Sequence, residues 1–205
     1  MDIIISMRKC WADMIFNGEK PFEFRSFNPL NFSLDDNIFI YESKANGGSG
    51  KVVGYFKTDS ILDLESGFVE RYFLPYFCKY ILKDEESAKQ FELASKISLT
   101  NYTAGVAILF ALDKNAVEFM EKNNDWPPFE ITNAVDRFKT ENIISLCDEW
   151  LTKIGFFNSC GETNYKKSIR IINPIKFDEP ISLDKFQNVE GEKISRAPQS
   201  WQYIR

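Results

Sequence analysis

Apolar residues recur every three or four positions between residues 7 and 17, which predicts a short amphipathic helix near the start of the chain. Ser6 stands where it could cap the first turn, and Gly18 stands where a left-handed residue would end the helix. Alternating apolar and polar positions then predict strands over residues 22–27, 37–43 and 51–58. The N-terminal part is therefore expected to hold one helix and several strands.

The pattern changes beyond residue 67, where aromatic residues recur at helical intervals up to residue 81. Pro75 is expected to interrupt this helix. Further helices are predicted over residues 84–97 and from Thr140, as a cap, to Ile154. Residues 106–112 could form either a buried strand or a helical segment. Helix therefore dominates the middle of the chain.

Strand character returns in the last third of the chain. Residues 168–173 alternate, and the terminal "APQSWQYIR" places β-favouring aromatic residues after Pro198, which predicts an edge strand. Strands from both ends must then pair across the helical middle. The overall pattern predicts an α+β protein.

Charge is unevenly distributed along the 205 residues. The formal net charge of -5 argues against a protein that coats nucleic acid nonspecifically, because that mode needs many lysine and arginine contacts. Residues 63–154 hold 10 Lys and Arg against 16 Asp and Glu, whereas the flanking segments hold 15 against 14. The acidic excess therefore belongs to the helical middle.

The composition also narrows the possible chemistry. The chain has no histidine, so catalysis would have to use carboxylates, lysines or hydroxyls. The four cysteines are widely spaced without a C-x-x-C pair, which predicts reduced thiols and no zinc site, and we expect no metal or cofactor. The longest apolar run, residues 104–112, is far too short for a membrane-spanning helix, which needs about 20 residues. The segment "MDIIIS" does not resemble a signal peptide, so we expect a cytoplasmic protein.

The segment "GEKPFEFR" places three charged residues among phenylalanines. In a strand Glu23 and Arg25 share one face, and a turn at Gly18 and Pro21 could bring Lys20 beside them. One interpretation is a solvated, salt-bridged strand face. The other is a cleft in which an arginine held by a glutamate offers donors to a phosphate or a base edge, with the lysine as a point charge.

The order Gly-x-Lys-x-x-Glu-x-Arg after a short helix resembles the signature of the ASCH domain, a member of the PUA-like superfamily. The segments "IFIYESK", "VVGYFKTDSI", "PIKFDEPISLDKF" and "PQSWQYI" are similar to the family's paired and closing strands. The resemblance implies a PUA-like mixed β-barrel with flanking helices, formed by residues 1–62 and 155–205. Residues 63–154 would then be an acidic, mainly helical insertion.

The resemblance also implies a cleft that binds RNA or a modified nucleoside. Some bacterial members are amidohydrolases on acylated cytidine, and they resemble this chain at Lys20 and Arg25 but carry a nucleophilic threonine where Glu23 stands. Three hypotheses follow: binding of RNA or a nucleotide, a hydrolase acting on RNA or an acylated nucleoside with Lys20 and Glu23 as catalytic residues, and an adaptor that binds a protein partner through the acidic insertion.

Two further segments supply secondary candidates. "NGGSGK" is not a P-loop, because Ala45 occupies the first glycine position and Val52 replaces the Ser or Thr that would hold magnesium. Lys44 beside this loop could still contact phosphate. Ser200 and Trp201 lie on opposite faces of a strand, so one could enter the cleft while the other packs in the core. The candidate ligand-binding residues are Gly18, Lys20, Glu23, Arg25, Lys44, Ser200 and Trp201.

Overall fold

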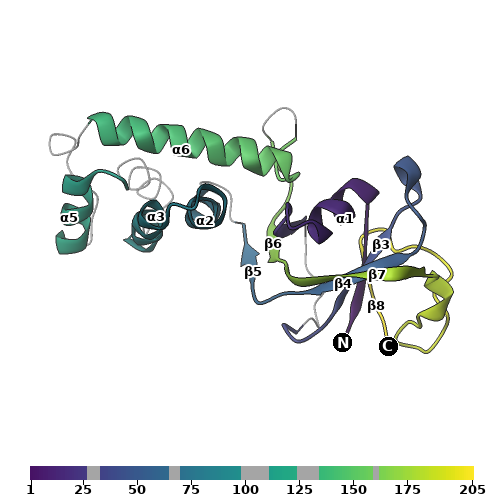
Figure 1. Ribbon diagram of the computed structural model, residues 1–205. Coiled ribbons are helices and arrows are strands. Elements are labelled where there is room, and N and C mark those ends of the chain that lie inside the picture. Colours follow the sequence, from purple (N-terminus) through teal and green to yellow (C-terminus); the bar gives the residue numbers. More distant parts are fainter. Residues whose placement is uncertain (27–32, 65–69, 98–110, 124–133, 159–161) are drawn as a thin grey trace. The chain divides into compact units, whose positions relative to one another are not determined.

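The computed structural model describes residues 1–26, 33–64, 70–97, 111–123, 134–158 and 162–205. The chain divides into two compact units, one made of Met1–Leu64 with Thr163–Arg205 and the other of Glu65–Glu162 (Figure 1). The first unit carries strands with a helix on them, and the second is helical. The chain is thus a mixed α+β protein.

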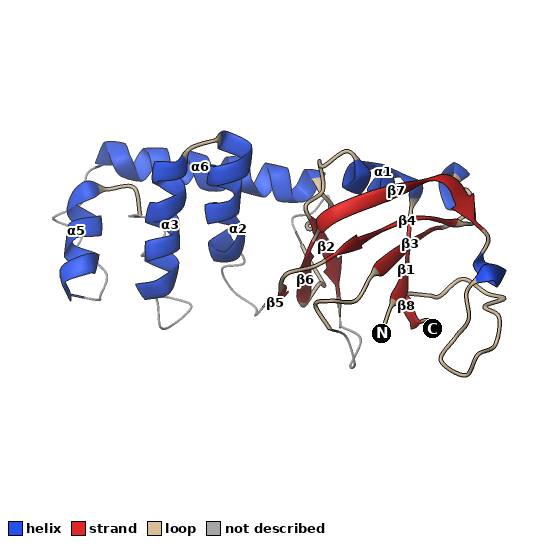
Figure 2. Cartoon of the chain, turned by 60° about the horizontal axis from the view of Figure 1, so that its bottom comes forward, coloured by secondary structure: helices blue, strands red, loops and turns tan. Residues whose placement is uncertain are grey.

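A five-stranded sheet dominates the first unit, and Figure 2 shows its strands side by side. Strands β1 and β3 run parallel, and the other neighbouring pairs are antiparallel. The short terminal strand lies at one edge, as the aromatic residues after Pro198 predict. In spatial order the strands are β7 (Ile172–Ile181), β4 (Val52–Lys57), β3 (Ile38–Glu42), β1 (Ile3–Met7) and β8 (Trp201–Tyr203).

A second, three-stranded antiparallel sheet consists of β2 (Phe22–Arg25), β6 (Lys167–Arg170) and β5 (Ile61–Asp63). The expected closed β-barrel is therefore wrong for the described residues, which form two separate sheets. The strands of the second sheet have only three or four residues each. They pair with one another, and β7 and β8 remain the edges of the larger sheet.

Helix α1 (Lys9–Phe16) covers one face of the larger sheet. Its residues Ala12 and Ile15 are buried in a cluster with Ile5 and Ile40, and Trp11 packs against this cluster. The opposite face is covered by the segment after β7, which contains the short 3-10 helix η4 (Leu183–Lys185). Because both faces of β1 are buried, its sequence "IIISM" does not alternate, and the periodicity did not predict this strand.

Ser6 does not cap the first helix, so that prediction is wrong. It lies in β1, and its hydroxyl donates a hydrogen bond to the carbonyl of Pro198 at 2.6 Å. Arg8 takes the N-cap position without a side-chain capping bond. The position expected for the cap is part of the strand because β1 pairs with β3 as far as Met7.

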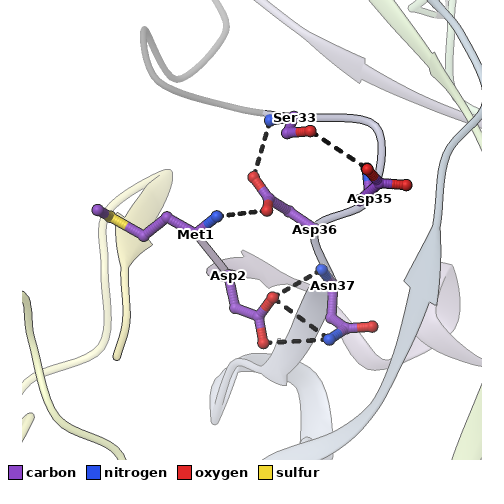
Figure 3. Close-up of polar contacts among 6 residues, drawn as sticks. All are labelled: Met1, Asp2, Ser33, Asp35, Asp36 and Asn37. Atoms are coloured by element: carbon purple, nitrogen blue, oxygen red, sulfur yellow. Dashed lines mark hydrogen bonds and ion pairs between the residues drawn. The ribbon is translucent and has the colours of Figure 1, made fainter.

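Polar contacts fix the start of β1 to the residues that precede β3 (Figure 3). The Asp2 carboxylate accepts a hydrogen bond from the backbone of Asn37 at 2.8 Å and from its side-chain amide. Asp36 accepts one from the backbone of Ser33 at 2.7 Å and pairs with the amino group of Met1. These contacts join the residues at the start of the parallel pair, in which Ile3 lies opposite Ile38.

The second unit contains the helices α2 (Glu70–Tyr76), α3 (Glu85–Ile97), α5 (Lys114–Asn123) and α6 (Ala134–Lys153), with a π-helix, η2 (Phe77–Leu82), directly after α2. Helices α2, α3 and α5 lie side by side, and α6 runs crosswise to them (Figures 1 and 2). The predicted helix over residues 84–97 is confirmed, with the Asp84 carboxylate accepting from the Ser87 backbone at 3.0 Å.

Other predictions for the second unit differ in detail. Pro75 lies inside α2, and the backbone changes to the π-helix two residues later. Helix α6 begins before Thr140, which is buried within it and does not cap it. Most of the segment 106–112 lies outside the described residues. Among the described helices, none is long and apolar enough to cross a membrane.

The cysteines are free thiols where the structure describes them. Cys78 and Cys147 are buried and Cys10 is exposed, while Cys160 lies outside the described residues. Within the described ranges, no cluster of acidic residues and cysteines has an arrangement that could hold a metal ion.

Candidate functional site

The motif begins with a left-handed turn at the end of α1. Gly18 has φ of 75° and donates its N–H to the Ile15 carbonyl at 3.1 Å, while the N–H of Glu19 reaches the Met14 carbonyl at 2.8 Å. These two bonds form a Schellman motif and confirm the predicted glycine cap. The backbone of Lys20 also donates to Met14, at 3.1 Å. The turn therefore folds the motif back against the helix.

Lys20, Glu23 and Arg25 converge in the structure. One carboxylate oxygen of Glu23, Oε1, lies 2.8 Å from Nη2 of Arg25, and the other, Oε2, lies 4.0 Å from Nζ of Lys20. Lys20 is 4% exposed and Glu23 is 6% exposed. A solvated strand face would leave both side chains in water, so this burial excludes that interpretation.

Lys20 is surrounded by aromatic rings as well as by Glu23. Its Nζ lies 4.4 Å from the centre of the Phe24 ring and 5.3 Å from that of Trp11, within the range of cation–π attraction. Burial lowers the pKa of Lys20 to about 8; the Glu23 carboxylate opposes this shift, and the Arg25 guanidinium adds to it. An appreciable fraction of this amine is therefore unprotonated just above neutral pH.

Arg25 connects the two sheets. Its Nη1 donates to the carbonyl and the hydroxyl of Ser200 at 3.2 and 3.3 Å, and its Nη2 donates to the carbonyl of Ser6 at 3.1 Å. With Glu23, these contacts give four acceptors for the four terminal N–H groups. The expectation that Arg25 keeps donors free for a phosphate is therefore wrong for its terminal N–H groups. Its Nε is buried with no hydrogen-bond partner.

A pocket of about 420 Å³ opens beside this cluster. It lies within the first unit, and residues from β1, α1, β2 and the segment before β8 form it. Tyr165, which is 37% exposed, stacks on Phe24 with 5.9 Å between ring centres. Lys20 does not line the pocket. The lining residues are Ser6, Met7, Arg8, Trp11, Glu23, Phe24, Arg25, Ser26, Tyr165 and Ser200.

The secondary candidates separate into one that reaches the pocket and two that do not. Ser200 lines it, whereas Trp201 packs against the core cluster beneath α1 and touches Tyr203 edge to face. Lys44 is exposed in the connection between β3 and β4, next to the 3-10 helix η1 (Ala45–Gly47), and does not line the pocket. Gly18 contributes the turn and lies outside the lining.

Seven of the ten lining residues were not among the sequence candidates, and Arg8, Trp11 and Tyr165 are three of them. Arg8 directly precedes α1, and Trp11 lies on its apolar stripe, so the helical pattern placed both without indicating a pocket. Tyr165 lies in an irregular segment before β6, where no helix or strand periodicity in the sequence indicates which way its side chain points. A second pocket of about 420 Å³ is lined by Met1, Asp2, Val189, Ile204 and Arg205, and none of the motif residues reaches it.

Comparison with known proteins returns structural matches but no sequence match. No protein-family model and no curated protein matches the chain. The ASCH structure from Zymomonas mobilis matches with 15% identity and a TM-score of 0.45, covering 100% of this chain and 87% of that one. A mutant of the same protein matches with 14% identity and a TM-score of 0.42, covering 100% and 88%. ASCH is also the family that the segment "GEKPFEFR" resembles, and at these values the similarity assigns no ligand or activity.

Proposed function

We propose that the pocket beside Glu23 and Arg25 binds a nucleotide, free or within RNA. The observation that carries this proposal is the combination of a buried cluster of two cations and one carboxylate with an adjoining pocket that has aromatic walls. The pocket volume of about 420 Å³ lies within the range of small-molecule sites.

The chemistry of the lining suits a nucleobase. A base has a flat π face and a hydrogen-bonding edge, and proteins commonly hold it by stacking on aromatic side chains. Trp11, Phe24 and Tyr165 supply aromatic surface, while Glu23 and the serine hydroxyls supply polar groups. Among the charged side chains of the lining, Arg8 and Arg25 outnumber the single Glu23 carboxylate, which favours a ligand that carries negative charge.

Calorimetric titration with the four nucleoside monophosphates and with short single-stranded RNA tests this proposal. We expect binding that Tyr165→Ala weakens by about 5- to 100-fold, the usual effect of losing one stacking partner. Tyr80→Ala is the matched control, because Tyr80 is a half-exposed tyrosine of η2 outside the pocket. Absence of binding by the folded wild-type protein to every nucleotide and RNA would overturn the proposal.

A hydrolase is the second candidate, and the state of Lys20 is the observation that favours it. A buried amine with a pKa of about 8, 4.0 Å from a carboxylate, could take up and release a proton near neutral pH. The substrates would be RNA or an acylated nucleoside, as the ASCH resemblance implies. Product formation followed by mass spectrometry should disappear in Lys20→Met. The hypothesis fails if the purified protein converts neither substrate.

A further inference from the structure

The commitment of Arg25 to Glu23, Ser6 and Ser200 means that a phosphate in the pocket needs another cation. Arg8 lines the same pocket and is exposed. It has no ion pair among the described residues, and its neighbour Lys9 is engaged with Asp13 at 2.7 Å. Arg8 is thus the pocket arginine whose guanidinium stays available for a bidentate contact with phosphate.

Glu23 adds a constraint on the part of the ligand that enters the pocket. Its Oε1 is engaged by Arg25, whereas Oε2 is 4.0 Å from Lys20, longer than a hydrogen bond. An ionised carboxylate only accepts hydrogen bonds. It therefore pairs with an amino group on a base and repels a carbonyl oxygen at the same position.

We propose that the pocket selects nucleotides whose base carries an exocyclic amino group, with that group donating to Glu23 and the phosphate contacting Arg8. The preferred bases are therefore cytosine, adenine and guanine, and uracil and hypoxanthine are disfavoured. The inference rests on the proposed function, because it names the ligand class of the same pocket. Glu23 determines base choice, and Arg8 supplies the affinity for phosphate.

Matched pairs of ligands test the base contact. The full-length protein is titrated with AMP against IMP and with CMP against UMP, since each pair differs at the amino position. We expect the amino-bearing member to bind about 5- to 100-fold more tightly, the discrimination typical of one good base contact. Glu23→Gln should bring the two members of each pair to similar affinity, because an amide both donates and accepts. Circular dichroism and binding of UMP by this variant check that it is folded.

Comparison of CMP with cytidine tests the phosphate contact. We expect CMP to bind more tightly in the wild-type protein and Arg8→Gln to remove most of that advantage, while cytidine binding is retained. Arg196→Gln is the matched control, because Arg196 is an exposed arginine of the same unit outside the pocket lining. The dependence of CMP affinity on salt should also decrease in the Arg8 variant only.

The outcomes separate this inference from the proposed function. Failure of every nucleotide to bind would overturn both. Binding with equal affinity for CMP and UMP, or with preference for UMP, would overturn the role of Glu23 and leave nucleotide binding intact. An unchanged CMP-to-cytidine ratio in Arg8→Gln would overturn the role of Arg8.

Discussion

Arg25 donates two hydrogen bonds to Ser200, one to its carbonyl at 3.2 Å and one to its hydroxyl at 3.3 Å. The two residues are 175 positions apart in the sequence: Arg25 lies in β2 of the smaller sheet, and Ser200 directly precedes β8 of the larger one. Together with the bond from Arg25 to the Ser6 carbonyl, this contact fastens β2 to β1 and to the residues before β8. Arg25 is therefore a structural residue as well as a pocket residue.

Loss of this link should destabilise the first unit. We expect Arg25→Ala to lower the free energy of unfolding by about 2 to 5 kcal/mol, because it removes the guanidinium donors of the Ser6 and Ser200 carbonyls and leaves Glu23 without its closer cation. Urea unfolding followed by tryptophan fluorescence measures the effect, with Arg196→Ala as the control expected to change stability by less than about 0.5 kcal/mol. Equal stability of Arg25→Ala and wild type would contradict the structural role.

Burial of Lys20 makes stability depend on pH. Its pKa is 10.5 in the unfolded chain and about 8 in the folded one, so the unfolded state binds more protons between these values and stability rises with pH across this window. Below pH 8 the buried charge is a net cost. We expect Lys20→Met to raise the free energy of unfolding at pH 7 by about 1 to 3 kcal/mol, since one pKa unit corresponds to about 1.4 kcal/mol.

The same variant provides its own check at higher pH. The stability difference between Lys20→Met and wild type should shrink as the pH approaches 10, because wild-type Lys20 is then neutral when folded. Parallel urea titrations at pH 7 and pH 9.5 measure this difference. If the difference in free energy of unfolding between Lys20→Met and wild type were the same at both pH values, the result would argue against a lowered pKa at Lys20.

Gly18 allows a substitution that separates backbone strain from crowding. No atom lies within 4 Å of a Cβ built at this position, but φ is 75°, which favours glycine. We expect Gly18→Ala to cost about 1 kcal/mol and Gly18→Asn to cost less, because asparagine tolerates the left-handed conformation. Thermal unfolding distinguishes the two. Unfolding temperatures of Gly18→Ala and Gly18→Asn that both equal the wild-type value would contradict a stability cost from the left-handed conformation at this position.

The sequence predicted those helices and strands in which apolar and polar residues follow a clear helical or alternating pattern. The strands β2, β3 and β4 and the helices α1 and α3 lie where the sequence places them, within a few residues. Helix periodicity and a glycine cap are properties of adjacent residues, so a single sequence reveals them. The exposed strand β7 was predicted only at its start, because most of its side chains are exposed on both faces.

Other features depend on residues far apart in the chain. The separation into two sheets follows from which strands pair, and no local pattern shows that. The motif correctly placed Lys20, Glu23 and Arg25 together, but two acceptors of Arg25 are backbone carbonyls, which side-chain patterns cannot reveal. The adaptor hypothesis for residues 63–154 stays a prediction.

The bond from Ser6 to the Pro198 carbonyl spans 192 positions, and β1 pairs with β8. During synthesis on the ribosome, β1 therefore leaves the exit tunnel long before the segment that closes one side of the pocket. Until that segment emerges, the backbone edge of β1 that pairs with β8 has no partner strand, so chaperones or other chains can bind there. The pocket beside Glu23 and Arg25 is thus among the last parts of this fold to be completed.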